Sequence, residues 1–198
     1  MIKETLLVST FGLLGLVTVA CGSQKKDQTA EAVSETAWCL DGFERPTGVN
    51  PVIKPLPTKF YCPMREDSVA WEESDTFNPA ATIYDGKIVV MYRAEDNSAQ
   101  GIGSRTSRLG YAISTDGIHF ERDTKPAFYP AKDNQAENEC PGGTEDPRIA
   151  MTEDGTYVLL YTQWNRKVPR LAVATSKDLK HWTKFGPAFE KAYNGKFS

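Results

Sequence analysis

Apolar and polar residues alternate over short runs along the second half of the chain, and turn sequences separate the runs. The first set of runs covers residues 78–84, 87–94, 108–114 and 119–122, with Asp-Gly pairs at 85–86 and 116–117. Such alternation is typical of β-strands with one buried face, and Asp-Gly between two of them is a hairpin signal. The pattern predicts a four-stranded antiparallel meander.

The same order of strands and turns occurs a second time, over residues 146–151, 157–163, 170–176 and 181–184. His119 matches His181 in the two units, and Arg108 matches Arg170, which favours structural roles for these side chains. Repeated four-stranded meanders build a β-propeller, with one blade to each unit. We therefore predict an all-β fold, with about two blades of a propeller in residues 77–198. Because two blades cannot close a propeller, we expect the chain to be a fragment of a longer protein; the alternative is that the two units form an incomplete sandwich.

Residues 38–76 do not follow this pattern. They contain five prolines and show little periodicity. Prolines at this density favour loops over regular elements. We expect an irregular segment that wraps the outside of the domain or covers the mouth of a site.

The N-terminus has the features of an export signal. Lys3 precedes an apolar run that ends at Ala20, and the run is too short to be a membrane-spanning helix of a mature protein. Residues 18–23, Thr-Val-Ala-Cys-Gly-Ser, resemble a bacterial lipoprotein signal in which Cys21 receives the lipid; ordinary cleavage is the alternative. We predict a signal peptide over 1–20 and a flexible tether over 21–37. The protein would then be a lipoprotein anchored in the membrane through Cys21, in the periplasm or on the outer-membrane surface.

Charge and cysteine content narrow the function further. The formal net charge is -3 and no basic stripe is present, which argues against nucleic acid as a partner. Cys39, Cys62 and Cys140 allow at most one internal bridge, and we expect Cys39–Cys62, with Cys140 a free buried thiol. No Cys-x-x-Cys pair, His-x-x-x-His pair or phosphate-binding glycine loop occurs, so we expect neither a metal site nor a cofactor.

The segment Gly142-Gly143-Thr144-Glu145-Asp146-Pro147-Arg148-Ile149 carries the main candidate chemistry. In an extended strand, Asp146 and Arg148 should project to one side while Glu145 points to the other. One interpretation is a catalytic or sugar-binding carboxylate at the inner start of a strand. The other is a buried ion pair that closes a turn.

Comparison of the two units adds candidate binding residues. Asn78 corresponds to Asp146, so both should face the same central channel. The second strands end in Tyr92-Arg93-Ala94-Glu95-Asp96-Asn97 and in Tyr161-Thr162-Gln163-Trp164-Asn165. Polar groups beside an aromatic ring suit a sugar, because the ring covers an apolar sugar face while the polar groups bind hydroxyls. Trp164 and Asn165 are therefore candidate sugar contacts.

Four segments, residues 77–80, 92–97, 143–149 and 174–182, together resemble the N-terminal part of glycoside hydrolase family 130. The resemblance implies a five-bladed β-propeller that acts on β-mannosides as a phosphorylase or a hydrolase. It also implies that Asp146 is the proton donor. The residues that it places near the bound mannosyl unit are Asn78, Arg93, Asp96 and Arg148.

A phosphorylase needs cations that hold phosphate beside the anomeric carbon. Arg166, Lys167 and Arg170 are the candidates, with inorganic phosphate as co-substrate. Export favours hydrolysis, because a sugar phosphate made outside the cytoplasm is easily lost. We predict an inverting hydrolase of β-mannosidic linkages, with its general base beyond Ser198. A β-mannoside phosphorylase that releases mannose 1-phosphate and a glycan-binding lipoprotein without turnover are the alternatives. The oligomeric state stays open.

Overall fold

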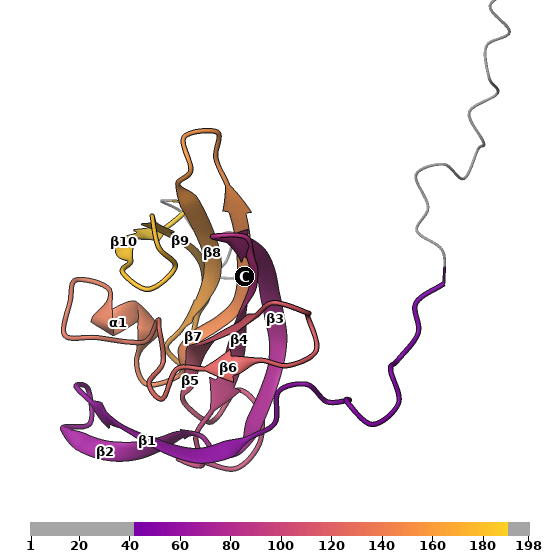
Figure 1. The fold of residues 1–198 in the computed structure, drawn as a ribbon. Helices are drawn as coiled ribbons and strands as arrows, with labels where there is room; N and C mark the ends of the chain where they lie inside the picture. Colours follow the sequence, from indigo (N-terminus) through magenta and orange to yellow (C-terminus); the bar gives the residue numbers. More distant parts are fainter. Residues whose placement is uncertain (1–41, 190–198) are drawn as a thin grey trace, which may run out of the picture. The chain divides into compact units, whose positions relative to one another are not determined.

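The computed structural model describes residues 42–189 (Figure 1). The predicted signal peptide and tether, with Cys21 and Cys39, lie outside the described residues. The chain divides into two compact units between Glu44 and Arg45, and every strand belongs to the second unit.

The first predicted meander is confirmed. Its strands β3 (Asp75–Tyr84), β4 (Lys87–Glu95), β5 (Ser107–Ser114) and β6 (Glu121–Arg122) pair antiparallel in chain order. Asp85 and Gly86 join β3 to β4 with φ of 49° and 69°, the backbone that a tight hairpin turn requires. In β4, Val89 and Met91 are fully buried on one face, which explains the alternation seen in the sequence.

The second predicted meander is also confirmed. It consists of β7 (Gly143–Met151), β8 (Tyr157–Trp164), β9 (Pro169–Ser176) and β10 (Thr183–Pro187), again antiparallel in chain order. β7 begins three residues before the predicted Asp146, at Gly143. The regular secondary structure of the described residues is therefore almost entirely β, with one short helix, α1 (Ala136–Glu139), that the sequence did not predict. The β-propeller stays a prediction.

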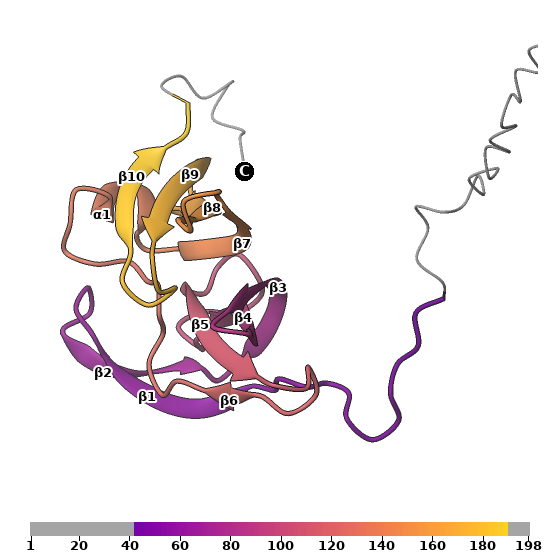
Figure 2. The ribbon, with the colours of Figure 1, turned by 45° about the horizontal axis from the view of Figure 1, so that its top comes forward.

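The two meanders are joined by one short stretch of strand pairing. Ser107 of β5 and Gly143 of β7 form one parallel bridge, and the Ser107 amide donates to the Gly142 carbonyl at 2.8 Å. β3 and β7, the first strands of the two meanders, also contact each other, and both views show β7 beside the first meander (Figure 2).

A common hydrophobic core spans both meanders. It contains residues of β4, β5, β8 and β9 together with one loop residue: Met91, Leu109, Phe128, Leu159, Tyr161, Ala172 and Ala174. Because each meander contributes side chains to the same core, the apolar burial that stabilises one meander depends on the presence of the other.

The prediction that residues 38–76 are irregular is wrong for part of that range. β1 (Leu56–Cys62) and β2 (Asp67–Glu72) form an antiparallel hairpin, and β3 begins at Asp75. Pro57 lies where the β1–β2 register shifts, a position at which a strand tolerates proline. The hairpin is held by Trp71, which is fully buried and stacks on Tyr92 of β4 with ring centroids 6.2 Å apart.

The matched histidines occupy equivalent places, as predicted. His119 Nδ1 lies 2.7 Å from Asp116 Oδ2, and His181 Nδ1 lies 2.6 Å from Asp178 Oδ2. In each unit the same aspartate also accepts the histidine backbone amide at 2.8 Å. Each pair therefore closes a turn between two strands.

The predicted Cys39–Cys62 disulfide is wrong, because Cys62 is a free, buried thiol. Its sulfur accepts a hydrogen bond from Arg108 Nη2 at 3.6 Å. Cys140 is also a free thiol, as expected, and is partly buried. No helix in residues 42–189 has the length and hydrophobicity of a membrane span.

Candidate active site

β3 and β7 begin with the same irregularity. The register shifts between Phe77 and Ala80 in β3 and between Glu145 and Arg148 in β7. At these bulges Asn78 has φ of 42° and Asp146 has φ of 48°. Asparagine and aspartate tolerate this left-handed backbone better than most residues do. A bulge redirects a side chain, and here both side chains turn toward one point.

Asn78 and Asp146 meet across the two meanders. Asn78 Nδ2 donates to Asp146 Oδ1 at 2.9 Å, so the two side chains lie together. That both face a central channel stays a prediction. The side chain of Asp146 is 37% exposed. Its second oxygen, Oδ2, receives no hydrogen bond from residues 42–189. One oxygen of the carboxylate is thus held by the protein and the other is free to meet a ligand.

Arg93 of β4 connects Asp146 to two glutamates. Its Nη1 lies 3.0 Å from Asp146 Oδ1, and its Nη2 lies 2.8 Å from Glu145 Oε1 and 2.6 Å from Glu95 Oε1. Its Nε donates to Ser107 Oγ at 3.1 Å. The guanidinium is almost fully buried, so its single positive charge is divided among three carboxylates.

The prediction that Glu145 points away from Asp146 is wrong. Glu145 is buried and contacts the same arginine as Asp146. The bulge between Glu145 and Arg148 breaks the alternation of side chains on which the prediction relied. Arg148, expected on the face of Asp146, is exposed and donates to the Pro147 carbonyl at 2.8 Å.

Burial raises the pKa of the Glu145 carboxyl to about 7. Within this net value Arg93 and the Ser107 hydroxyl act to lower the pKa, and the nearby carboxylates of Asp146 and Glu95 act to raise it. A carboxyl that titrates near neutral pH beside a half-exposed aspartate is typical of functional sites. The sequence analysis gave Glu145 no role here, because it assumed a regular strand.

Glu95, Ser107 and Arg105 were also missed as parts of this site. Glu95 lies two residues after Arg93 on the same strand, so period-two alternation could have placed both on one face. Arg105 pairs with Asp75, and its Nη1 lies 3.5 Å from Glu95 Oε2. Nothing in the local sequence distinguishes Ser107 or Arg105.

Asp96, predicted near the sugar, is 2% exposed and is bonded within the protein. Its Oδ2 lies 2.9 Å from Arg108 Nη1, and its Oδ1 accepts the backbone amides of Ser98 and Thr106. Burial acts to raise the pKa of Asp96, but Arg108 and Ser98 hold it below its ordinary value. The structure thus shows Asp96 ordering the loop after β4. A sugar contact by Asp96 stays a prediction.

The other predicted contacts lie at the end of β8, in the loop that follows it and at the start of β9. Trp164 Nε1 donates to the Gly103 carbonyl at 2.7 Å, and Asn165 Oδ1 accepts the amides of Lys167 and Val168 at 3.1 and 2.9 Å. Arg170 donates to the Val168 carbonyl at 3.1 Å and is partly exposed, unlike its buried counterpart Arg108. The matched arginines therefore do not share one structural role.

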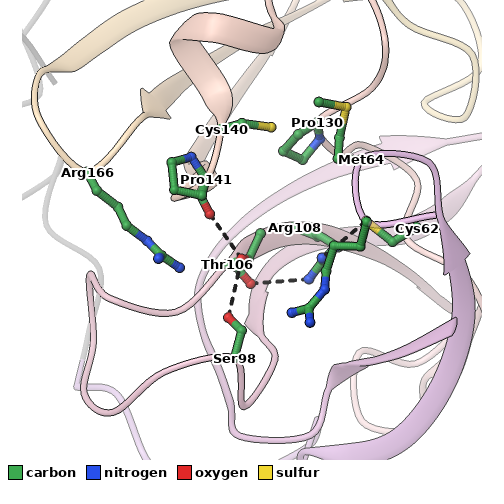
Figure 3. Close-up of a pocket in the computed structure, with 10 residues that line it drawn as sticks. Cys62, Met64, Ser98, Thr106, Arg108, Pro130, Cys140, Pro141 and Arg166 are labelled. Atoms are coloured by element: carbon green, nitrogen blue, oxygen red, sulfur yellow. Dashed lines mark hydrogen bonds between the residues drawn. The ribbon is translucent and has the colours of Figure 1, made fainter. Parts of the chain in front are cut away.

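Arg166 lines a cavity of about 310 Å³ together with Arg65, Arg108 and Cys140 (Figure 3). Neighbouring residues of a strand project to opposite faces, so Arg108 faces this cavity while Ser107 faces Arg93. The cavity therefore opens on the opposite face of β5 from Asp146. Burial raises the pKa of the Cys140 thiol to about 11, so the thiol stays protonated at neutral pH.

No group of three or more histidine, cysteine, aspartate or glutamate side chains within the described part of the chain is arranged to hold a metal ion. The acid at the site is instead oriented by an amide and a guanidinium. The chemistry that these residues offer is proton transfer and hydrogen bonding, the two requirements of acid catalysis on a sugar oxygen.

The described part of the chain thus consists of two repeated antiparallel meanders with an oriented carboxylate where they meet. The family model described as β-1,4-mannooligosaccharide phosphorylase matches residues 51–196. The chain belongs to glycoside hydrolase family 130.

Relatives of known sequence or structure agree with this assignment. A 1,2-β-oligomannan phosphorylase of Thermoanaerobacter sp. (strain X514) is 38% identical over 125 residues, which cover 61% of this chain and 40% of the relative. A crystal structure of a candidate glycoside hydrolase from Parabacteroides distasonis is 99% identical, with a TM-score of 0.78 over 83% of this chain and 47% of that one. The chain spans about two-fifths of the length of the curated relatives it matches.

A third similar structure is named for family 130 glycoside hydrolases that target β-1,2-mannosidic linkages in Candida mannan. It is 68% identical, with a TM-score of 0.76 over 81% of this chain and 45% of that one.

Proposed function

We propose that the whole protein hydrolyses β-mannosidic linkages and that Asp146 is the acid that acts on the glycosidic oxygen. The observation that carries this proposal is the geometry of the Asp146 carboxylate. Asn78 and Arg93 hold Oδ1 at 2.9 and 3.0 Å, and Oδ2 is left for a substrate. A catalytic acid needs this combination of a fixed orientation and an accessible oxygen.

The reaction fits single-displacement inversion. Asp146 would protonate the leaving oxygen while a second carboxylate activates water on the opposite face of the sugar, with roughly 6.5 to 9.5 Å between the two carboxyl groups. Glu145 and Glu95 are bonded to Arg93 on the same side as Asp146, which does not suit that second role. The base stays a prediction for a carboxylate beyond Ser198.

The cations at the site favour hydrolysis over phosphorolysis. Phosphate beside the anomeric carbon requires positive charge that is not already neutralised. Within residues 42–189, Arg93 is the one cation that contacts Asp146, and its charge is taken up by three carboxylates. The predicted phosphate ligands Arg166, Lys167 and Arg170 make no contact with Asp146 in the same part of the chain.

The names of similar proteins support one particular mannosidic linkage. The Thermoanaerobacter phosphorylase is named for β-1,2-linked mannan. The similar structure named for Candida mannan hydrolases carries the same β-1,2 linkage in its name. We extend the proposal to β-1,2-linked mannose, although the family model carries a β-1,4 name. The lipoprotein-like N-terminus supports action outside the cytoplasm, on glycans at the cell surface.

A β-mannoside phosphorylase is the second candidate, because the curated relatives carry that name. The deciding experiment uses the full-length protein, since the chain spans less than half of its relatives. β-1,2-Mannobiose and β-1,4-mannobiose are incubated with and without inorganic phosphate, and mannose is separated from mannose 1-phosphate. Free mannose at a rate independent of phosphate supports the hydrolase. Mannose 1-phosphate formed only with phosphate contradicts it, and binding without any product supports a glycan-binding protein.

A further inference from the structure

Two buried glutamates compete for the same two partners beside Asp146. Oε1 of Glu95 and Oε1 of Glu145 lie 2.6 and 2.8 Å from Arg93 Nη2. The same two oxygens lie 3.2 and 3.1 Å from Ser107 Oγ. The exposed fraction of Glu95 is 0% and that of Glu145 is 8%, so water does little to screen the repulsion between the two carboxylates.

The hydrogens available at this point do not satisfy two ionised glutamates. Arg93 Nη2 has two hydrogens and can donate one to each Oε1, but the Ser107 hydroxyl has only one. Arg93 Nε already donates to Ser107 Oγ, which leaves that oxygen one acceptor position. Ser107 can therefore donate to one glutamate and accept from the other. Both contacts are hydrogen bonds only if one glutamate carries a proton.

The surrounding charges also indicate that one of the two glutamates carries a proton. Arg93 and Arg105 are the cations that face the pair, while Asp146 and Asp75 are further carboxylates on the same two arginines. Asn78 is the remaining polar group next to Asp146. Four carboxylates thus meet two guanidinium groups. Uncompensated buried charge is costly, and a carboxyl group in this situation takes up a proton instead.

The proton belongs on Glu145. Glu95 has a second cation close by, with Arg105 Nη1 3.5 Å from its Oε2, whereas Arg93 is the one cation that pairs with Glu145 within residues 42–189. Glu145 also sits next to Asp146 in the chain, where another negative charge is least favourable. The elevated pKa of the Glu145 carboxyl, which burial brings to about 7, agrees with this assignment.

We propose that Glu95 and Glu145 hold a single proton between them through Ser107, and that Glu145 is a positioning residue for Asp146. With the proton in place, Arg93 faces two negative charges and keeps its Nη1 on Asp146. When the proton leaves to solvent, Arg93 faces three, and an additional charge lies beside the catalytic acid. The kinetic part of this inference rests on the proposed hydrolase function, whereas the shared proton does not.

The proton can be observed directly by infrared spectroscopy on the full-length protein. The C=O stretch of a protonated carboxyl lies at a higher frequency than the bands of a carboxylate or of a glutamine amide. We expect the difference spectrum between wild type and Glu145→Gln to show this band at about pH 6, and to lose it by about pH 8. Identical spectra at both pH values would overturn the shared proton. This measurement holds whether or not the protein cleaves mannosides.

The kinetic test is the pH profile of kcat/KM for β-mannobiose cleavage. Wild type should lose activity with an alkaline midpoint near pH 7, and Glu145→Gln, which imitates the protonated side chain, should retain its activity through that range. Glu139→Gln is the matched control, since Glu139 is also a fully buried glutamate and is paired with Lys184 instead. An alkaline limb that persists in Glu145→Gln would overturn the positioning role.

Ser107→Ala gives a second variant in case Glu145→Gln does not fold. Because the Ser107 hydroxyl contacts both glutamates, its removal should shift the midpoint of the infrared band. An unchanged midpoint would contradict the bridging role of Ser107.

Discussion

Asn78 and Asp146 occupy the same position of two repeated meanders, and Asn78 Nδ2 donates to Asp146 Oδ1 at 2.9 Å. Each lies at a bulge and precedes a proline, and φ is 42° at Asn78 and 48° at Asp146. The repeat therefore builds one site from two equivalent strand starts, in which one unit supplies an amide and the other an acid.

Asp146→Asn should abolish turnover while substrate binding is retained. The amide keeps the shape and the contact with Arg93 but cannot deliver a proton, so we expect kcat to fall by roughly 10²- to 10⁴-fold. Mannose release by the full-length protein and calorimetric titration with β-mannobiose measure the two effects. Asp154→Asn, at an exposed turn, is the matched control and should leave both unchanged. Normal turnover in Asp146→Asn would remove Asp146 from the mechanism.

Replacing Asn78 separates orientation of the acid from backbone strain. Asn78→Gly and Asn78→Ala both remove the donor to Asp146, so kcat should fall roughly tenfold to a hundredfold in each. Alanine at φ of 42° also costs about 1 kcal/mol of folding stability, which glycine does not. Steady-state kinetics and urea unfolding distinguish the effects. Unchanged kinetics in both variants would show that Asn78 does not orient the acid.

Gly143→Ala should separate the two meanders. A Cβ atom at Gly143 would lie 2.1 Å from the Ser107 carbonyl oxygen, and φ is 113°. We expect a loss of about 3 kcal/mol or more in the free energy of unfolding. Gly155→Ala is the control, because φ is 74° but nothing lies within 4 Å of its Cβ; about 1 kcal/mol is expected there. If Gly143→Ala and Gly155→Ala lost the same free energy of unfolding in urea, the close contact between Gly143 and Ser107 would not contribute to stability.

The folding stability should depend on pH through Glu145. Its pKa is raised from 4.5 to about 7 in the folded state, so the folded protein holds this proton more tightly than the unfolded chain does. The resulting stabilisation is complete below about pH 4.5 and is lost as the pH rises through 7, an effect of about 3 kcal/mol. Urea unfolding of wild type and Glu145→Gln across this range isolates the effect. Parallel pH curves for the two proteins would contradict it.

Much of the fold could be predicted from alternation and repetition. Strand period and Asp-Gly turns act over a few residues, so both meanders and the correspondence of Asn78 with Asp146 were predicted. The β1–β2 hairpin was missed, because prolines hide its alternation and its burial depends on the stacking of Trp71 against Tyr92, far along the chain.

The site could be predicted only in part. Asp146, Asn78 and Arg93 were named as site residues and do meet, but Arg148 and Asp96 have other partners in the structure. Cys62 was expected in a disulfide and is instead a free thiol beside Arg108. Arg108, which pairs with Asp96 and contacts Cys62, lies 12 and 46 residues from them, where local pattern carries no information. Arg148 was misplaced because the bulge at Asp146 breaks the alternation of side chains.

The sequence alone therefore determined which strands form the two meanders, which of these strands are equivalent, and that Asp146 stands at the start of one. Only the tertiary structure decided that Glu145 turns inward, because one left-handed residue at a bulge reverses the direction that strict alternation would give it. It likewise decided that Arg93 binds three carboxylates at once, since β4 and β7 come together only when both meanders pack on a common core.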